Sequence, residues 1–194
     1  MLSDLPNILT LSRIAAIPLL VLLIAINQPI TDLLAALLFA LAAATDWLDG
    51  QIARTRAQLS DLGRVLDPIA DKLLVGATLM VLVGFRRLPF AGIYPAIVIM
   101  LREILVSGLR ECLAQIRVGL PVTRLAKWKT GTQMVSLLIL LLGNPGARLI
   151  GIGGFPAAAA GASLLWLAAI LTLITGWDYL TAGLNHINHS HETR

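Results

Sequence analysis

The sequence predicts an all-α integral membrane protein, built as a bundle of six transmembrane helices with both termini in the cytoplasm. Hydrophobic residues make up 57% of the 194 residues and charged residues only 13%, whereas about a quarter of a soluble domain is charged. Long apolar runs recur along the chain, and the basic residues gather on one side of them. This composition excludes a soluble globular domain, and its richness in apolar residues excludes a disordered chain.

The apolar runs follow one another over the whole chain. A helix needs about 20 mostly apolar residues to cross a bilayer. Glycine, proline and polar residues separate the runs, as is typical of loops between helices. No repeat or linker divides the chain, so residues 1–194 are expected to form one domain. The six predicted spans are residues 8–27, 31–53, 63–85, 90–113, 127–143 and 157–183.

Each span has its own boundary signals. The first follows Asp4 and Pro6, with no basic segment before it and no A-x-A-type cleavage site after it. A retained helix rather than a signal peptide is therefore expected. The second span begins after Pro29, and the small residues at the start of the sixth allow close helix packing. The gaps after the second, third and fifth spans are residues 55–62, 86–89 and 143–146.

The basic residues set the orientation. The chain carries 15 lysines and arginines against 11 acidic residues, a net charge of +4. With both termini inside, only Arg86, Arg87 and Arg148 remain on the outer side. Because cytoplasmic loops are enriched in lysine and arginine, this distribution predicts cytoplasmic termini. Six spans also return the two termini to one side.

Four aspartates lie at the cytoplasmic ends of the second and third spans. Asp46 and Asp49 are three residues apart and Asp67 and Asp71 four, so each pair shares one helix face. Because a short turn joins the two spans as an antiparallel pair, all four carboxylates can converge. Even one charge costs on the order of 2.5–3.5 kcal/mol inside a membrane, so the four carboxylates must be neutralised.

Divalent cations neutralise such a group well, because hard cations take carboxylate oxygens. Two Mg²⁺ ions would balance the four charges, and two-metal sites clamp phosphate oxygens during phosphoryl chemistry. Gly50 beside them lets a ligand approach the backbone, although helix packing is an alternative role. The alternative for the aspartates is helix capping, or ion pairing with Arg54, Arg64 and Lys72.

This run of residues resembles the signature of the CDP-alcohol phosphotransferases, D-x-x-D-G-x-x-A-R, eight residues, then G-x-x-x-D-x-x-x-D. The resemblance implies a six-helix membrane bundle, usually a homodimer, over nearly the whole chain. It also implies transfer of a phosphatidyl or similar group from a CDP-linked donor to an alcohol, with release of CMP. The defined positions are filled by Asp46, Asp49, Gly50, Ala53, Arg54, Gly63, Asp67 and Asp71.

The resemblance also implies a role for each position. Asp71 would be the base that takes the proton of the acceptor hydroxyl. Asn7 and Thr10, near the N-terminus, would contact the nucleotide. The alternative for this segment is that Asn7 caps the first helix and Arg13 reaches the membrane surface. The ligands of two Mg²⁺ ions, with Mn²⁺ as a substitute, would be Asp46, Asp49, Asp67 and Asp71. The contacts to the nucleotide and CDP-diacylglycerol would be Asn7, Thr10, Gly50, Ala53, Arg54, Ser60 and Gly63.

Three further stretches, residues 6–13, 102–111 and 127–134, resemble the bacterial family members that make phosphatidylglycerol phosphate. One departure is Ala126, where a glycine is expected. The resemblance implies CDP-diacylglycerol and sn-glycerol 3-phosphate as substrates and no nucleic-acid partner. It also implies a location in the bacterial inner membrane, with the active site facing the cytoplasm.

Because sn-glycerol 3-phosphate is a dianion, it requires a basic pocket. Arg102 and Arg110 lie two turns apart on one helix face, and Lys127 and Lys129 begin the next span on the same side. We expect these four residues to bind the acceptor phosphate. The alternative is ordinary positive charge at span ends, paired with lipid headgroups, with Arg102 held by Glu103 or an aspartate.

Two other functions fit part of the sequence. A divalent-metal transporter would use the aspartates as its ion site, but such sites lie near the bilayer midplane, often between repeats. A sister phosphotransferase with an uncharged alcohol acceptor would not need the basic cluster. The tail histidines, His186, His189 and His191, are expected to be solvated, and Asp178 is assigned no role.

Overall fold

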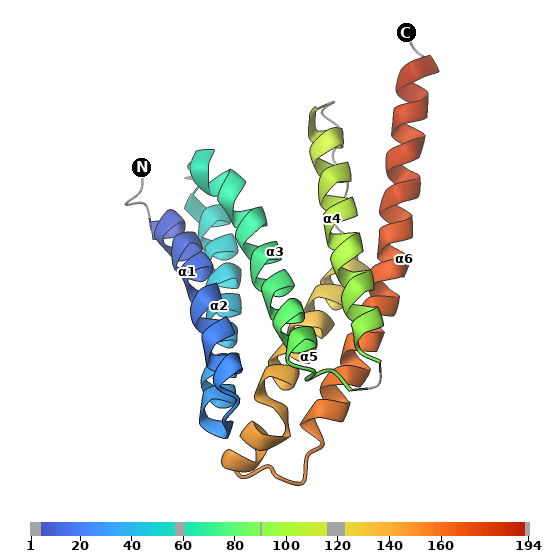
Figure 1. Cartoon of the computed structure of the whole chain (residues 1–194). Coiled ribbons are helices and arrows are strands. Elements are labelled where there is room, and N and C mark those ends of the chain that lie inside the picture. Colours follow the sequence, from blue (N-terminus) through green and yellow to red (C-terminus); the bar gives the residue numbers. More distant parts are fainter. Residues whose placement is uncertain (1–4, 57–60, 90, 116–122, 193–194) are drawn as a thin grey trace.

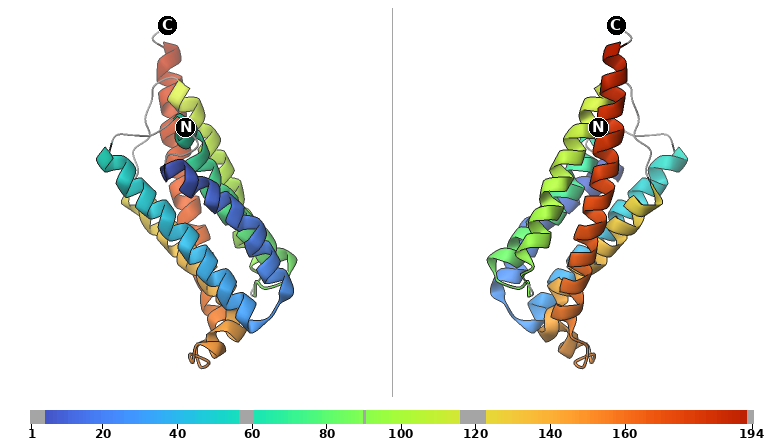
Figure 2. Two further views of the ribbon diagram at one scale, coloured as in Figure 1. Left: turned by 90° about the vertical axis from the view of Figure 1, so that its left-hand side faces the viewer. Right: turned by 90° about the vertical axis from the view of Figure 1, so that its right-hand side faces the viewer.

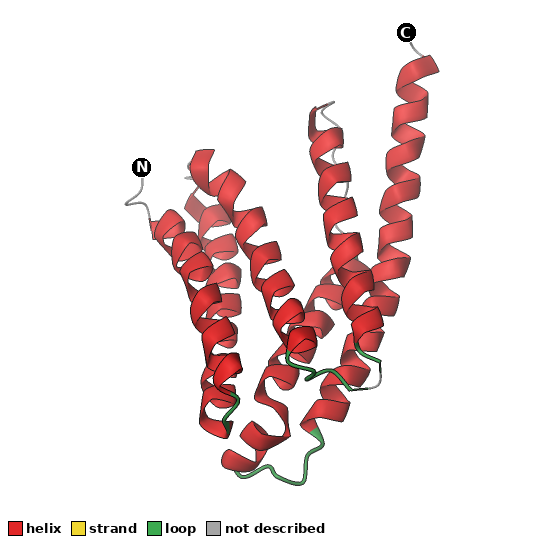
Figure 3. Cartoon of the chain, viewed as in Figure 1, coloured by secondary structure: helices red, strands yellow, loops and turns green. Residues whose placement is uncertain are grey.

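The computed structural model of the chain describes residues 5–56, 61–89, 91–115 and 123–192, with side chains at 8–45, 66, 68–89, 91–114 and 123–183. Six helices and no strand make up the described part (Figure 3). The helices are α1 (Leu5–Ile26), α2 (Pro29–Arg56), α3 (Asp61–Gly84), α4 (Ile93–Gln115), α5 (Arg124–Leu149) and α6 (Ala157–Glu192).

The six helices confirm the all-helical prediction, and each predicted span overlaps one helix. The largest differences lie at the ends of α5 and α6. In α5 the backbone leaves the helix at Gly143, with φ +58° and ψ −179°, and then resumes a short helical segment to Leu149. Pro145 stands in the first turn of that segment, where its missing N–H group costs nothing. The predicted break is therefore right, but it is a kink and not a loop.

Two of the helices have the length and composition to cross a membrane, over Ile8–Ile26 and Ala157–Gly183, among the described residues. Pro29–Thr45 of α2 is apolar but shorter. Charged residues such as Asp71, Arg102 and Lys129 interrupt the other predicted spans. Six membrane crossings with cytoplasmic termini thus remain a prediction.

The helices pack in a spatial order that differs from their order along the chain. α1 packs on α2 and α3, α2 on α5, α5 on α6, and α6 on α4, whereas α3 touches α4 and α5 at few points. The start of α1 and the ends of α2, α4 and α6 point to one end of the bundle (Figures 1 and 2). The fully buried core includes Leu20, Phe39, Leu74, Leu82, Ile99, Leu137 and Leu165.

At the end of the bundle opposite the start of α1, Arg87, Asp32 and Asn27 form a group of polar contacts that we call the clasp. The Arg87 guanidinium donates to the Asp32 carboxylate at 2.6 Å and to the Asn27 side-chain oxygen at 2.7 Å. It also donates to the Ile24 carbonyl at 3.3 Å. Asp32 lies in the first turn of α2 and Arg87 follows α3. The clasp therefore connects the start of α2 and the turn before it to the segment after α3. Helices α2 and α3 are the two that carry the four aspartates.

Candidate active site

The predicted metal ligands lie on two helices at the end of the bundle that holds both chain termini. Asp46 and Asp49 belong to the last half of α2, and Asp67 and Asp71 to the first half of α3. Only Asp71 has a described side chain. It is half-buried, and its carboxylate interacts electrostatically with the Lys129 ammonium of α5. One predicted metal ligand therefore lies close enough to a predicted phosphate-binding residue for their opposite charges to attract each other.

Most of the predicted nucleotide contacts fall on side chains outside the described residues, and for them the prediction stands as made. They are Asn7, Gly50, Ala53, Arg54 and Gly63, together with the metal ligands Asp46, Asp49 and Asp67, whereas Ser60 lies wholly outside.

The described N-terminal residues face the interior of the bundle. Thr10 is fully buried, and Arg13, one turn later on α1, is only 1% exposed. Arg13 therefore does not reach the membrane surface, which was the alternative for this segment. Because α1 packs on α2 and α3, these two polar side chains belong to the same group of helices as the aspartates.

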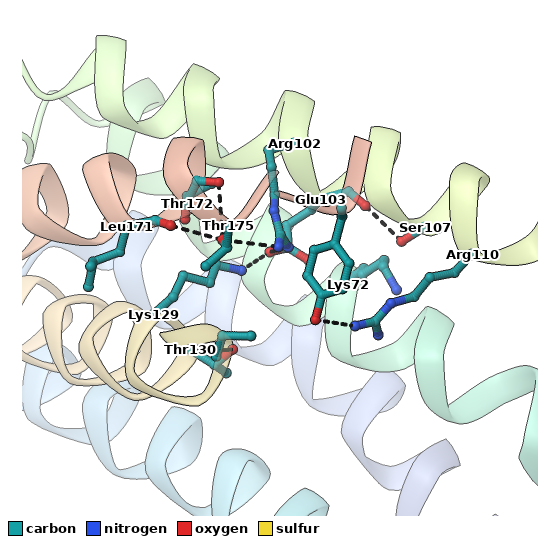
Figure 4. A network of polar contacts seen from close by, with 12 residues as sticks. Lys72, Arg102, Glu103, Ser107, Arg110, Lys129, Thr130, Leu171, Thr172 and Thr175 are labelled. Atoms are coloured by element: carbon teal, nitrogen blue, oxygen red, sulfur yellow. Dashed lines mark hydrogen bonds and ion pairs between the residues drawn. The ribbon is translucent and has the colours of Figure 1, made fainter. Parts of the chain in front are cut away.

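A carboxylate connects two of the predicted phosphate-binding residues. The Lys129 ammonium and the Arg102 guanidinium both donate to the same oxygen of Glu103, the latter at 3.4 Å (Figure 4). Arg102 also donates to the Thr175 hydroxyl on α6 at 3.2 Å. The Lys129 side chain is only 4% exposed. A buried ammonium needs a partner of opposite charge. The Glu103 carboxylate provides that charge and so stabilises Lys129 inside the bundle.

Arg110 joins the same group of side chains through Tyr179 of α6. Its guanidinium donates to the Tyr179 hydroxyl at 3.1 Å. The guanidinium carbons of Arg110 and Arg102 lie 5.0 and 5.6 Å from the centre of the Tyr179 ring. We call Arg102, Glu103, Arg110, Lys129 and Tyr179 the α4–α6 cluster. It contains three of the four residues predicted to bind the acceptor phosphate.

Two further lysines, Lys72 and Lys127, form no hydrogen bond or ion pair with the α4–α6 cluster among the described residues. Lys127 is exposed, and its predicted role stays a prediction. Lys72 of α3 donates to the Pro68 carbonyl at 3.2 Å. Sequence reasoning named Lys72 only as a counter-ion of the aspartates.

Sequence reasoning missed several polar residues around the cluster. Within the described part of the chain, the Gln133 side-chain oxygen, the Thr172 hydroxyl and the Arg102 Nε are buried without a hydrogen-bond partner. A buried polar atom left unpaired costs about 1–3 kcal/mol, so such atoms indicate a place for water or a ligand. A signal was present in the sequence, because Thr172, Thr175 and Tyr179 form a polar stripe on an otherwise apolar helix.

The chain is similar in sequence to known proteins. The chain matches the model of the CDP-alcohol phosphatidyltransferase family over residues 3–174. A protein of Rickettsia bellii is 47% identical over 92% of this chain and 94% of its own length. Proteins of Cereibacter sphaeroides and Bacillus subtilis are 39% and 37% identical over 95% and 92% of this chain, and over 97% and 94% of their own lengths. All three relatives are named CDP-diacylglycerol–glycerol-3-phosphate 3-phosphatidyltransferase.

Proposed function

The chain belongs to the CDP-alcohol phosphatidyltransferase family, and we propose that it transfers the phosphatidyl group of CDP-diacylglycerol to sn-glycerol 3-phosphate. The products are phosphatidylglycerol phosphate and CMP. The relatives' shared name supports the reaction, and one observation on this chain supports the acceptor. The α4–α6 cluster gathers three cations and a single carboxylate, an excess of positive charge that suits a dianionic phosphate and has no use for an uncharged alcohol.

The donor end of the site is assigned to α2 and α3. Carboxylates are the ligands that Mg²⁺ prefers, and the last half of α2 and the first half of α3 carry Asp46, Asp49, Asp67 and Asp71. The described Asp71 fits this set, because it is an oxygen donor at the same end of the bundle. Two Mg²⁺ ions, when bound there, would neutralise the pyrophosphate of the donor. Gly50 and Arg54 would contact the nucleotide, together with Asn7, Thr10, Ala53, Ser60 and Gly63.

Asp71 is the proposed base. A phosphate bound at Arg102, Arg110 and Lys129 places the rest of the acceptor near Asp71, because Asp71 already interacts with Lys129. Asp71 takes the proton of the acceptor hydroxyl, whose oxygen then attacks the phosphorus that carries the diacylglycerol. The bond from that phosphorus to CMP breaks, and CMP leaves with the electron pair.

The proposed setting is a bilayer. Large apolar side chains remain exposed on several helices, among them Leu22, Met80, Ile104 and Trp177, and lipid would cover them. We assign the protein to the bacterial inner membrane as a multi-pass homodimer. The charge distribution supports an active site that faces the cytoplasm.

The test is CMP release by purified protein with CDP-diacylglycerol and Mg²⁺, across glycerol 3-phosphate, serine, inositol, inositol phosphate and phosphatidylglycerol as acceptors. Only glycerol 3-phosphate should support release, and a chelator should abolish it. Release with another acceptor would overturn the assigned acceptor and favour a sister phosphotransferase. No release from folded protein with any acceptor would overturn the enzyme assignment, and Mg²⁺ flux into liposomes would then test a transporter.

Asp71→Asn tests the base in the same assay. The substitution keeps the shape of the side chain but removes its ability to take a proton, so release should fall by about 10²- to 10⁴-fold. Asp178→Asn, which changes an exposed acid on α6, is the matched control and should leave release unchanged. Normal release by folded Asp71→Asn protein would exclude Asp71 as the base.

A further inference from the structure

We propose that Tyr179 is a positioning residue of the acceptor site, which holds the Arg102 and Arg110 guanidinium groups ready for the acceptor phosphate. The proposal rests on the proposed function, because it assumes that these arginines bind glycerol 3-phosphate. It assigns a role to α6, the helix on which sequence reasoning placed no site residue.

The contacts of Tyr179 are specific to the two arginines. Its hydroxyl accepts a hydrogen bond from Arg110 at 3.1 Å, and its ring lies 5.0 Å from the Arg110 guanidinium carbon and 5.6 Å from that of Arg102. A cation within about 6 Å of a ring centre is attracted by the negative face of the ring. One side chain of α6 thus engages both arginines of α4.

The burial of Tyr179 and the exposure of Arg110 indicate that Tyr179 is the fixed partner of the two. Tyr179 is only 4% exposed, whereas Arg110 is exposed. A free arginine side chain samples many rotamers, and ordering it costs conformational entropy. The Tyr179 ring and hydroxyl order the Arg110 side chain before the ligand binds. Such preorganisation increases affinity, because the ligand no longer has to order the side chain.

The path of Arg102 along α6 provides a second, independent observation. A Cβ atom at Gly176 would lie 3.0 Å from the Arg102 Cγ, so the glycine leaves the space through which this side chain runs. Beyond it, Arg102 donates to Thr175 and approaches Tyr179. Three neighbouring residues of one α6 face therefore shape the position of a single arginine of α4.

The charges favour a ligand site over simple packing. The guanidinium carbons of Arg102 and Arg110 lie 5.6 and 5.0 Å from the centre of the same Tyr179 ring, and holding two like charges near each other is unfavourable without an anion. Glu103 offsets Arg102 and Lys129, and among the described residues no carboxylate pairs with Arg110 in this way. A dianionic phosphate would satisfy both guanidinium groups, because arginine binds phosphate through two parallel hydrogen bonds.

The experiment compares Tyr179→Phe, which keeps the ring, with Tyr179→Leu, which removes it. Tyr94→Phe is the matched control, because Tyr94 is the other tyrosine of the chain and is exposed at the opposite end of α4. The KM for glycerol 3-phosphate should rise about three- to tenfold in Tyr179→Phe and at least about tenfold in Tyr179→Leu. The KM for CDP-diacylglycerol should stay unchanged, as should both values in the control.

An unchanged KM for glycerol 3-phosphate in Tyr179→Phe and Tyr179→Leu would overturn the inference, as would an equal rise in the KM of both substrates. If Tyr179→Leu does not fold, Tyr179→Phe decides, because it preserves the packing. A wild-type protein that releases no CMP with glycerol 3-phosphate would instead overturn the proposed function. The two failures are therefore distinguishable.

Discussion

At the scale of single residues, Glu103 joins two of the three cations of the α4–α6 cluster. One of its oxygens accepts from both Lys129 and Arg102. Sequence reasoning treated an Arg102–Glu103 pair as an alternative to phosphate binding, yet the pair is part of the cluster. Spacing predicted that Arg102 and Arg110 share a helix face, but it did not predict Tyr179, because the contact of Tyr179 with Arg110 joins residues 69 positions apart.

Glu103→Gln should destabilise the protein and weaken acceptor binding. Removing one partner of a buried ion pair costs about 3–5 kcal/mol, and the change leaves Lys129 and Arg102 without their carboxylate. We expect a lower melting temperature in detergent and a higher KM for glycerol 3-phosphate. Glu111→Gln, at an exposed position on the same helix, should change neither. Equal melting temperatures for both variants would show that the pair contributes little.

At the scale of elements, apolar runs and proline or glycine breaks located all six helices. The end of α5 was less predictable, because Pro145 can stop a helix or begin one, and only the backbone conformation at Gly143 decides between the two. The extent of α6 to Glu192 was likewise not predictable, since its last turns carry no apolar pattern. Boundaries depend on local backbone geometry, which composition does not determine.

Gly143→Ala should lower stability at the kink. The backbone there, with φ +58° and ψ −179°, lies in a region that only glycine adopts readily, and another residue costs about 1–3 kcal/mol. Gly84→Ala is the matched control, because a Cβ atom at Gly84 meets nothing within 4 Å. Thermal unfolding should show a clear loss for Gly143→Ala and none for the control. The same melting temperature in both variants would contradict the strain assigned to Gly143.

At the scale of the whole molecule, the sequence could not predict which helices touch. Asp32 belongs to none of the motifs in the sequence and Arg87 was predicted to lie on the outer side, yet the two residues, 55 positions apart, form the clasp. Their side chains are only 3% and 12% exposed. The spatial order of the helices depends on such long-range pairs, which no local pattern encodes.

Asp32→Asn should loosen the whole bundle, because it leaves the Arg87 guanidinium buried without its carboxylate. The expected loss of stability is up to about 3 kcal/mol, measured as a lower midpoint of thermal unfolding. Adding Arg87→Gln should recover part of the loss, since the unpaired charge is then removed. Arg86→Gln alters the exposed neighbour and should have no effect. A double variant less stable than the sum of the two single changes would argue against the clasp.

Helix α3 makes only a few contacts with α4 and α5, so the carboxylates of the proposed site and most of its cations lie on helices that pack loosely against each other. In the proposed reaction the donor is dissolved in the membrane and the acceptor in water, and the two would meet between these loosely packed helices. The rate of the proposed reaction would then depend on the fraction of donor among the membrane lipids as well as on the concentration of dissolved acceptor. A change in lipid composition alone would then change the rate of product formation.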